Sequence, residues 1–300
     1  MKLREFSHFP LAFQILIILG KILPRRIGLG LASIIGTIGG SLKKTPRVQA
    51  LRANQWVIHN QQLTQKQLIK LPKVVYRSSA KCFFDYFYFL THPEKIEKYV
   101  NLSPEAEATI ERIKNNEPCI VVSPHISNFD LMGYVLATIG IEAQVLSFPD
   151  PKSTYKWQNE LRQRGGIVVT PMDLNAFRQA RKRLQNGGSI VTGLDRPLEG
   201  KYKEKYKPTF FGYQSNLPVT YTRMALEAQA PVFVFAVVYR PDGKYYLEGS
   251  PPIWMDAHDN LQDEILSNVQ KVLSFSEEII KKYPEQWAMF YPVWPQFLGV

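Results

Sequence analysis

The sequence predicts an α/β protein with a mainly parallel central sheet flanked by helices, preceded by an N-terminal hydrophobic, membrane-associating helical segment. From about residue 103 onward, short apolar runs typical of buried strands alternate with runs of helical spacing. Such alternation indicates a layered fold with a mostly parallel sheet. The first 45 residues instead carry two apolar runs on either side of a basic turn. We therefore expect a membrane anchor at 1–45 and one α/β domain at 46–300.

The two N-terminal apolar runs are Leu11–Leu19 and Ile27–Ile38. Neither reaches the ~18–20 uninterrupted apolar residues that a spanning helix needs. We expect the segment to lie in or on the membrane surface, with Lys21, Arg25 and Arg26 at anionic headgroups. Two other interpretations stay open: a pair of buried core helices in a soluble protein, and a weak single span.

The remaining elements follow from periodicity and from Gly, Pro and Asn stops. Helices at 47–62 and 70–90 come first, and the aromatic residues of the second predict a buried core. The alternating region has expected helices at 103–115, 128–139, 152–165, 173–188, 217–229 and 260–282, and expected strands at 119–123, 142–148, 167–170, 189–195, 231–240 and 244–250.

Composition limits the partners and the compartment. The formal net charge is +11, which indicates a nucleic acid, an anionic membrane surface or an acidic ligand as partner. The chain carries no RNP, zinc-finger or helix-turn-helix signature, so we expect no nucleic-acid partner. The two cysteines, Cys82 and Cys119, lie far apart and outside any CxxC pattern. This predicts neither a disulfide framework nor a metal site, and favours a reducing compartment.

The segment His125–Asp130, "HISNFD", follows the apolar strand at 119–123. Ligand sites of parallel sheets lie beyond the carboxyl ends of strands, and Asp195 also follows a strand end. If His125 lies on the turn and Asp130 in the first turn of the next helix, the carboxylate can reach back to one imidazole nitrogen. The other nitrogen is then free to accept a proton.

Such a unit has no nucleophile of its own, because no GxSxG elbow and no activated cysteine accompanies it. A base that activates a substrate hydroxyl fits acyl transfer from a thioester. The spacing alone is a weak signal. The alternative is a surface histidine followed by an aspartate that favours the helix dipole.

Further segments follow in a fixed order: "ELRQRGG" with Arg164 and its neighbour Arg162, "VTGLD" with Asp195, "PTFFG" at 208–212, and "PEQW" at 284–287. Together with the hydrophobic N-terminus and "HISNFD", they resemble the bacterial lysophospholipid acyltransferase superfamily. The closer resemblance is to its branch of lipid A late (lauroyl/myristoyl) acyltransferases and phosphatidylinositol mannoside acyltransferases. "PTFFG" and "PEQW" are the specific motifs. The acid and Gly that commonly follow the family's Asp are replaced here by "RPLEG".

The resemblance implies transfer of a fatty acyl chain to a hydroxyl of a glycolipid or lipid A-like membrane lipid. The donor would be a thioester of acyl-carrier protein or coenzyme A, used as co-substrate, with no bound cofactor and no metal. His125 would be the general base and Asp130 its orienting partner. The implied location is the cytoplasmic face of the cell inner membrane, with an anionic membrane surface as partner. The implied substrate-binding residues are Arg164, Asp195, Phe210, Phe211 and Gly212.

Alternatives remain at this point. From residue type alone, Arg164 is equally a solvated charge at a helix end, "PTFFG" equally a packed turn, and Trp287 a packing anchor. A glycerophospholipid (lysophosphatidate-type) acyltransferase is the rival enzyme, although its Phe-Pro-Glu-Gly box is absent near 193–200. A non-catalytic lipid-binding protein is the rival from another class.

Overall fold

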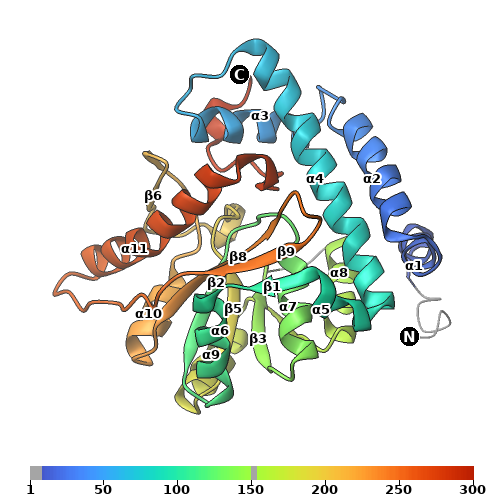
Figure 1. Cartoon of the computed structure of the whole chain (residues 1–300). Helices are drawn as coiled ribbons and strands as arrows, with labels where there is room; N and C mark the ends of the chain where they lie inside the picture. The colour runs from blue at the N-terminus through green and yellow to red at the C-terminus, as the bar shows by residue number, and fades with distance from the viewer. Residues whose placement is uncertain (1–8, 150–153) are drawn as a thin grey trace.

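The computed structural model describes residues 9–149 and 154–300, in which a seven-stranded sheet forms the centre of a mixed α/β fold (Figure 1). The strands lie in the order β1-β9-β8-β2-β5-β3-β4. Their bounds are β1 Val100–Leu102, β2 Cys119–Ser123, β3 Ala143–Ser147, β4 Val168–Pro171, β5 Ser189–Gly193, β8 Val232–Tyr239 and β9 Tyr245–Gly249. Strands β8, β2, β5, β3 and β4 are parallel, whereas β9 runs antiparallel to β8 and pairs in parallel with β1. The predicted α/β class with a mainly parallel central sheet is confirmed.

Helices flank both faces of this sheet. Beyond the N-terminal region they are α5 Ile96–Tyr99, α6 Pro104–Lys114, α7 Phe129–Thr138, α8 Thr154–Arg164, α9 Leu174–Gln185, α10 Thr220–Glu227 and α11 Leu261–Lys282. The elements predicted in the alternating region are confirmed to within a few residues. The short strand β1 and a hairpin of β6 Thr209–Phe210 and β7 Tyr213–Gln214 were not predicted. Residues 1–8 of the predicted anchor and 152–153 of the predicted helix lie outside the described residues.

The two faces of the sheet carry separate apolar cores, because side chains along a strand alternate between faces. Strand β2 is buried along its whole length. Cys119 and Val121 contribute to the core shared with α4, α6 and α7. Ile120 and Val122 contribute to the core shared with α9, α10 and α11. A parallel sheet buried on both faces produces continuous apolar runs such as "CIVV".

Strand register decides where the functional turns meet. β2 pairs with β5 over its full length, with Ser123 opposite Gly193 at the carboxyl ends. Two residues beyond these partners, the chain reaches His125 after β2 and Asp195 after β5. Because adjacent parallel strands end at one edge of the sheet, these two residues lie close together although 70 positions separate them.

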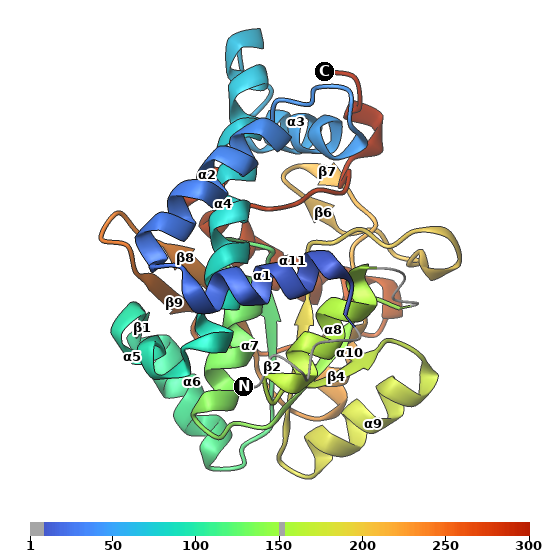
Figure 2. The same cartoon turned by 90° about the vertical axis from the view of Figure 1, so that its right-hand side faces the viewer.

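The N-terminal helices pack along one long helix at the side of the sheet (Figures 1 and 2). Their bounds are α1 Leu11–Ile22, α2 Arg25–Gly39, α3 Pro46–Ile58 and α4 Gln65–Thr91. Glycines allow α2 to approach α4 closely. A Cβ atom at Gly36 would lie 2.5 Å from the carbonyl oxygen of Tyr76, and one at Gly28 would enter the ring of Phe84. The predicted aromatic core is confirmed, since Phe87 and Phe89 of α4 are fully buried.

The opposite faces of α1 and α2 expose large apolar side chains. The exposed ones are Leu11, Ile15, Ile18, Ile22, Ile27, Leu31, Ile34, Ile35 and Ile38. Contiguous exposed apolar surface of this kind marks a binding surface. Within residues 9–149 and 154–300, no helix has both the length and the hydrophobicity needed to cross a membrane.

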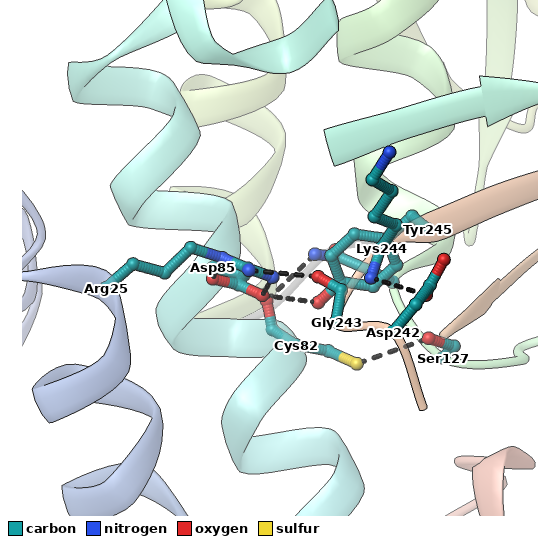
Figure 3. A network of polar contacts seen from close by, with 9 residues as sticks. Arg25, Cys82, Asp85, Ser127, Asp242, Gly243, Lys244 and Tyr245 are labelled. Atoms are coloured by element: carbon teal, nitrogen blue, oxygen red, sulfur yellow. Dashed lines mark hydrogen bonds and ion pairs between the residues drawn. The ribbon is translucent and has the colours of Figure 1, made fainter. Parts of the chain in front are cut away.

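Arg25 corrects one expectation for the N-terminus, because it does not face solvent. Its Nε and Nη2 donate to both carboxylate oxygens of Asp85 at 2.8 and 2.7 Å, and its Nη1 donates to the carbonyl of Gly243 at 3.0 Å (Figure 3). The hydroxyl of Tyr245 also donates to Asp85. Arg25 thus connects the start of α2 to α4 and to the β8–β9 turn, and the prediction that it contacts lipid headgroups is wrong. Lys21 and Arg26 are exposed.

Candidate active site

The turn that carries His125 is held from two sides. Its backbone pairs with the segment after α11: the amide of Ser127 donates to the carbonyl of Gln286, and the amide of Ala288 donates to the carbonyl of His125, each at 2.8 Å. Ser127 has a positive φ of 50°, a constrained geometry for a non-glycine residue. On the other side, its hydroxyl lies 3.3 Å from the thiol of Cys82 on α4 (Figure 3). The turn therefore has a defined conformation.

Asp195 is the partner of the imidazole. Nδ1 of His125 lies 2.5 Å from Oδ1 of Asp195, and the backbone amide of His125 donates to Oδ2 at 2.8 Å. The indole Nε1 of Trp287 donates to the same Oδ2 at 2.7 Å. Asp195 is fully buried, whereas the side chain of His125 is 19 % exposed. Among the described residues Nε2 of His125 has no hydrogen-bond partner, so the carboxylate orients the ring and leaves one nitrogen available.

Asp130 does not lie on the imidazole, which corrects the predicted geometry. Its Oδ1 accepts a hydrogen bond from Nε of Arg162 on α8 at 2.7 Å, and lies 2.6 Å from Nη2 of the same arginine in an ion pair. Asp130 lies in the first turn of α7, where it faces α8, and the preceding residue Phe129 packs its ring edge-on against His125. The carboxylate of Asp130 therefore pairs with the guanidinium of Arg162. The carboxylate that contacts the imidazole of His125 is that of Asp195.

Arg164, the favoured arginine of "ELRQRGG", points away from the site. It pairs with Glu160 one helical turn earlier, at 3.1 Å, and lies over the ring of Phe9. Its neighbour Arg162 is buried and donates to Asp130 and to Oδ1 of Asn159. Positions two apart on a helix differ by ~200°, so only one of the two arginines can face the interior.

The "PTFFG" segment forms the β6–β7 hairpin and packs against Trp287, the residue that donates to Asp195. Phe210 is fully buried and stacks on Trp294, with Trp287 as its second aromatic neighbour. Phe211 has a φ of 48° and donates its amide to Glu277, and Gly212 has a φ of 80°. None of the three is among the residues that line the two cavities described below, and their role in substrate binding stays a prediction.

Two cavities share the surface around His125. Both are lined by His125, Phe129, Asp130, Tyr155, Arg162 and Arg196. The first, called the apolar cavity below, extends along the sheet between Met132, Val145, Leu146, Ile167, Met172 and Val191. The second, called the larger cavity, has a volume of about 690 Å³ and extends toward α2, where Ile35, Gly36 and Gly39 line it. The histidine thus lies where an apolar ligand and a second ligand can meet.

The larger cavity also has polar groups without protein partners. The hydroxyls of Ser79 and Tyr86 line it, are buried, and have no hydrogen-bond partner among the described residues. Burial raises the pKa of Tyr86 well above its usual value, so this hydroxyl remains protonated and able to donate. Buried hydroxyls without a hydrogen-bond partner are costly, and these two belong to residues that line the larger cavity.

The family model of the bacterial lipid A biosynthesis acyltransferases matches residues 3–296, nearly the whole chain. The chain belongs to this family. It is therefore an acyltransferase, and the family implies a lipid acceptor and an acyl thioester donor in general terms. Among curated proteins, no match to this chain was found. Within the described part of the acyltransferase, no group of three or more His, Cys, Asp or Glu side chains is arranged to hold a metal ion.

Three residues of the acyltransferase site were missed or undervalued from sequence. Trp287 is the packing anchor expected from "PEQW", but it also donates to Asp195. Arg162 was named only as the neighbour of Arg164. Spacing offered a signal for it, because Tyr155, Asn159 and Arg162 lie at i, i+4 and i+7 on one face of α8. Arg196 was noted only as the first residue of "RPLEG".

Proposed function

We propose that this acyltransferase transfers a fatty acyl chain from a thioester of acyl-carrier protein or coenzyme A to a hydroxyl of a lipid A-like glycolipid. The reaction would take place at the cytoplasmic face of the cell inner membrane. The observation that carries the proposal is the His125–Asp195 pair. His125 lines both cavities, and its Nε2 is available to a substrate. Membership of an acyltransferase family supports the reaction class.

In the proposed mechanism His125 is the general base. Nε2 removes the proton of the acceptor hydroxyl, and the oxygen attacks the thioester carbonyl carbon to give a tetrahedral intermediate. The buried carboxylate of Asp195 stabilises the imidazolium that forms. When the carbon–sulfur bond breaks, the imidazolium returns the proton to the departing thiolate. General-base catalysis of this kind typically contributes ~10²–10⁴-fold in rate. These steps use no metal or redox cofactor.

The chemistry of the cavities supports an assignment of the two substrates. Aliphatic side chains dominate the apolar cavity, which suits the acyl chain. The larger cavity has unpartnered hydroxyls at Ser79 and Tyr86 and extends to the exposed residue Ile35 of α2, which suits the headgroup of a membrane lipid. Asp130 and Arg162 line both cavities, and their ion pair would fix the shape of the boundary between the two cavities.

The outer faces of α1 and α2 are the proposed membrane-contacting surface. Their large apolar side chains are exposed, and the exposed cations Lys21, Arg26, Lys43 and Lys44 lie along the same segment. Such a helix pair fits a monotopic attachment, with apolar residues below the headgroups and cations among them. Ile35 belongs to both this surface and the larger cavity, so an acceptor anchored in the bilayer would reach the site directly from this surface.

Steady-state acyl transfer from a labelled acyl thioester tests the catalytic proposal. His125→Ala should lower kcat by ~10²–10⁴-fold, and Asp195→Asn by a comparable factor, with melting temperatures near that of the wild type. Wild-type turnover by a folded His125→Ala protein would contradict the role of His125 as general base. The acceptor panel should include a lipid A precursor and lysophosphatidate. Exclusive use of lysophosphatidate would support the glycerophospholipid reading instead.

Partition into anionic vesicles tests the membrane surface. The triple change Ile27→Ser, Ile34→Ser and Ile38→Ser leaves the larger cavity intact and removes three exposed apolar side chains. Since burying each such side chain stabilises by ~1.5–3 kcal/mol, partition should fall by more than about 100-fold. Activity on a water-soluble, short-chain acceptor should remain. Equal partition of the variant and the wild type would exclude this surface.

A further inference from the structure

Arg196 is a cation held between aromatic rings at the boundary of both cavities. Its guanidinium carbon lies 3.8 Å from the centre of the Phe148 ring and 4.2 Å from that of Tyr291, with Tyr155 at 5.2 Å. Stacking on aromatic faces restrains the plane of a guanidinium. The N–H groups point outward in that plane, where they can donate hydrogen bonds to other groups. The side chain is therefore ordered by packing and not by a bound acid.

No carboxylate among the described residues pairs with Arg196. Its Nε is buried and has no hydrogen-bond partner. The carboxylate nearest in sequence, Asp195, is already occupied by His125 and Trp287. The two buried arginines in the described part of the chain differ from half-buried Arg196, because Arg25 is paired with Asp85 and Arg162 with Asp130. A guanidinium that is stacked between aromatic rings, lines both cavities and has no carboxylate partner among the described residues is available to an anionic ligand.

We propose that Arg196 binds a phosphoryl group of a substrate. A planar guanidinium offers parallel N–H donors that match two oxygens of a phosphate or phosphodiester. Of the two arginines that both cavities share, Arg162 is neutralised by Asp130, so Arg196 supplies the unpaired positive charge. This inference rests on the proposed function. Within it the phosphoryl group belongs either to the phosphopantetheine arm of the donor or to the headgroup of the acceptor lipid.

Equilibrium binding in neutral detergent micelles separates these two sources. The donor probes are S-dodecyl-coenzyme A, a thioether that cannot react, and S-dodecyl-pantetheine, which lacks phosphate. The acceptor probes are phosphatidic acid and diacylglycerol in dodecyl maltoside. The proteins are the wild type, Arg196→Gln, Arg196→Lys and the matched control Arg223→Gln, whose exposed arginine pairs with Glu227. Thermal melting verifies that each variant is folded.

Arg196→Gln should bind the phosphate-bearing probe of one pair ~10–100-fold more weakly, while the phosphate-free probe of that pair is unaffected. Weakening confined to S-dodecyl-coenzyme A assigns the site to the donor, and weakening confined to phosphatidic acid assigns it to the acceptor. Arg196→Lys keeps the charge but loses the planar fork, so its affinity should fall between those of the wild type and Arg196→Gln. If Arg196→Gln binds all four probes like Arg223→Gln, the assignment is wrong. Should Arg196→Gln not fold, the same comparison is made with folded Arg196→Lys.

Binding and catalysis are distinguishable in this design. His125→Ala should bind the phosphate-bearing probe like the wild type, although it transfers the acyl chain ~10²–10⁴-fold more slowly. If the wild type catalysed no transfer but Arg196→Gln still lost the phosphate-dependent affinity, the proposed function would fail and the phosphoryl site would stand.

Discussion

Trp287 donates its indole N–H to Oδ2 of Asp195 at 2.7 Å, so the "PEQW" segment near the C-terminus contacts the carboxylate that orients His125. The same segment pairs its backbone with the turn of His125, through Ile126 opposite Trp287. Side chain and backbone of one short segment therefore position both members of the pair. This makes the C-terminal motif part of the geometry of the site and not only of its packing.

Trp287→Phe should lower kcat by about tenfold with little change in KM, because Asp195 loses one of its donors while the cavities stay intact. Trp294→Phe is the matched control. Trp294 is equally buried, but its Nε1 has no hydrogen-bond partner among the described residues. Its replacement should leave kcat unchanged. Equal losses in both variants would show that aromatic packing, and not the hydrogen bond, supports catalysis.

The Asp130–Arg162 pair should matter for stability as well as for activity. Asp130→Ala leaves the guanidinium of Arg162 in a site where the side chain is only 9 % exposed, and should lower the free energy of unfolding by about 3 kcal/mol. The double change Asp130→Leu with Arg162→Met removes both charges and should regain most of that loss in a denaturant titration. Activity should stay low in the double variant if the pair shapes the boundary of the cavities. Full activity of the double variant would show that the Asp130–Arg162 pair contributes to stability and not to catalysis.

Gly193 lies against the imidazole, and a Cβ atom there would be 3.2 Å from Cε1 of His125. Gly193→Ala should displace the ring by a few tenths of an ångström and reduce kcat by about tenfold, since small misplacements of reacting groups are costly. Gly30→Ala makes the same chemical change where no heavy atom lies within 4 Å. That control should retain full activity. Wild-type kcat in Gly193→Ala would mean that the ring tolerates movement.

Cys82 should react slowly with thiol reagents, although it lines the larger cavity. Burial raises the pKa of its thiol to about 11, and only the thiolate above that pKa is a good nucleophile. Alkylation of the native protein by iodoacetamide should be very slow at pH 7.5 and accelerate about tenfold per pH unit toward pH 10. Mass spectrometry after tryptic digestion identifies the labelled residue. Rapid labelling of Cys82 at neutral pH would contradict the burial of the thiol.

The order of helices and strands, and the placement of His125 and Asp195 at strand ends, could be predicted from local patterns. Periodicity and turn residues carry that information, and the elements agree to within a few residues. The partner of His125 could not be predicted in the same way. Spacing within "HISNFD" suggested Asp130, whereas the helix direction after the turn sends this carboxylate to α8. The inward-facing arginine of "ELRQRGG" was misjudged for a related reason, because motif order does not tell which side chains face a cavity.

By itself, the sequence of this protein determined a parallel α/β layer structure, an apolar N-terminal segment and a histidine at a strand end, because these depend on interactions between near neighbours in the chain. Only the tertiary structure decided that β2 lies beside β5, that Asp195 and Trp287 converge on His125, and that Arg196 has no carboxylate partner within the described part of the chain. Those contacts join residues about 70 to 160 positions apart, and their formation depends on strand order and on which helix faces pack together.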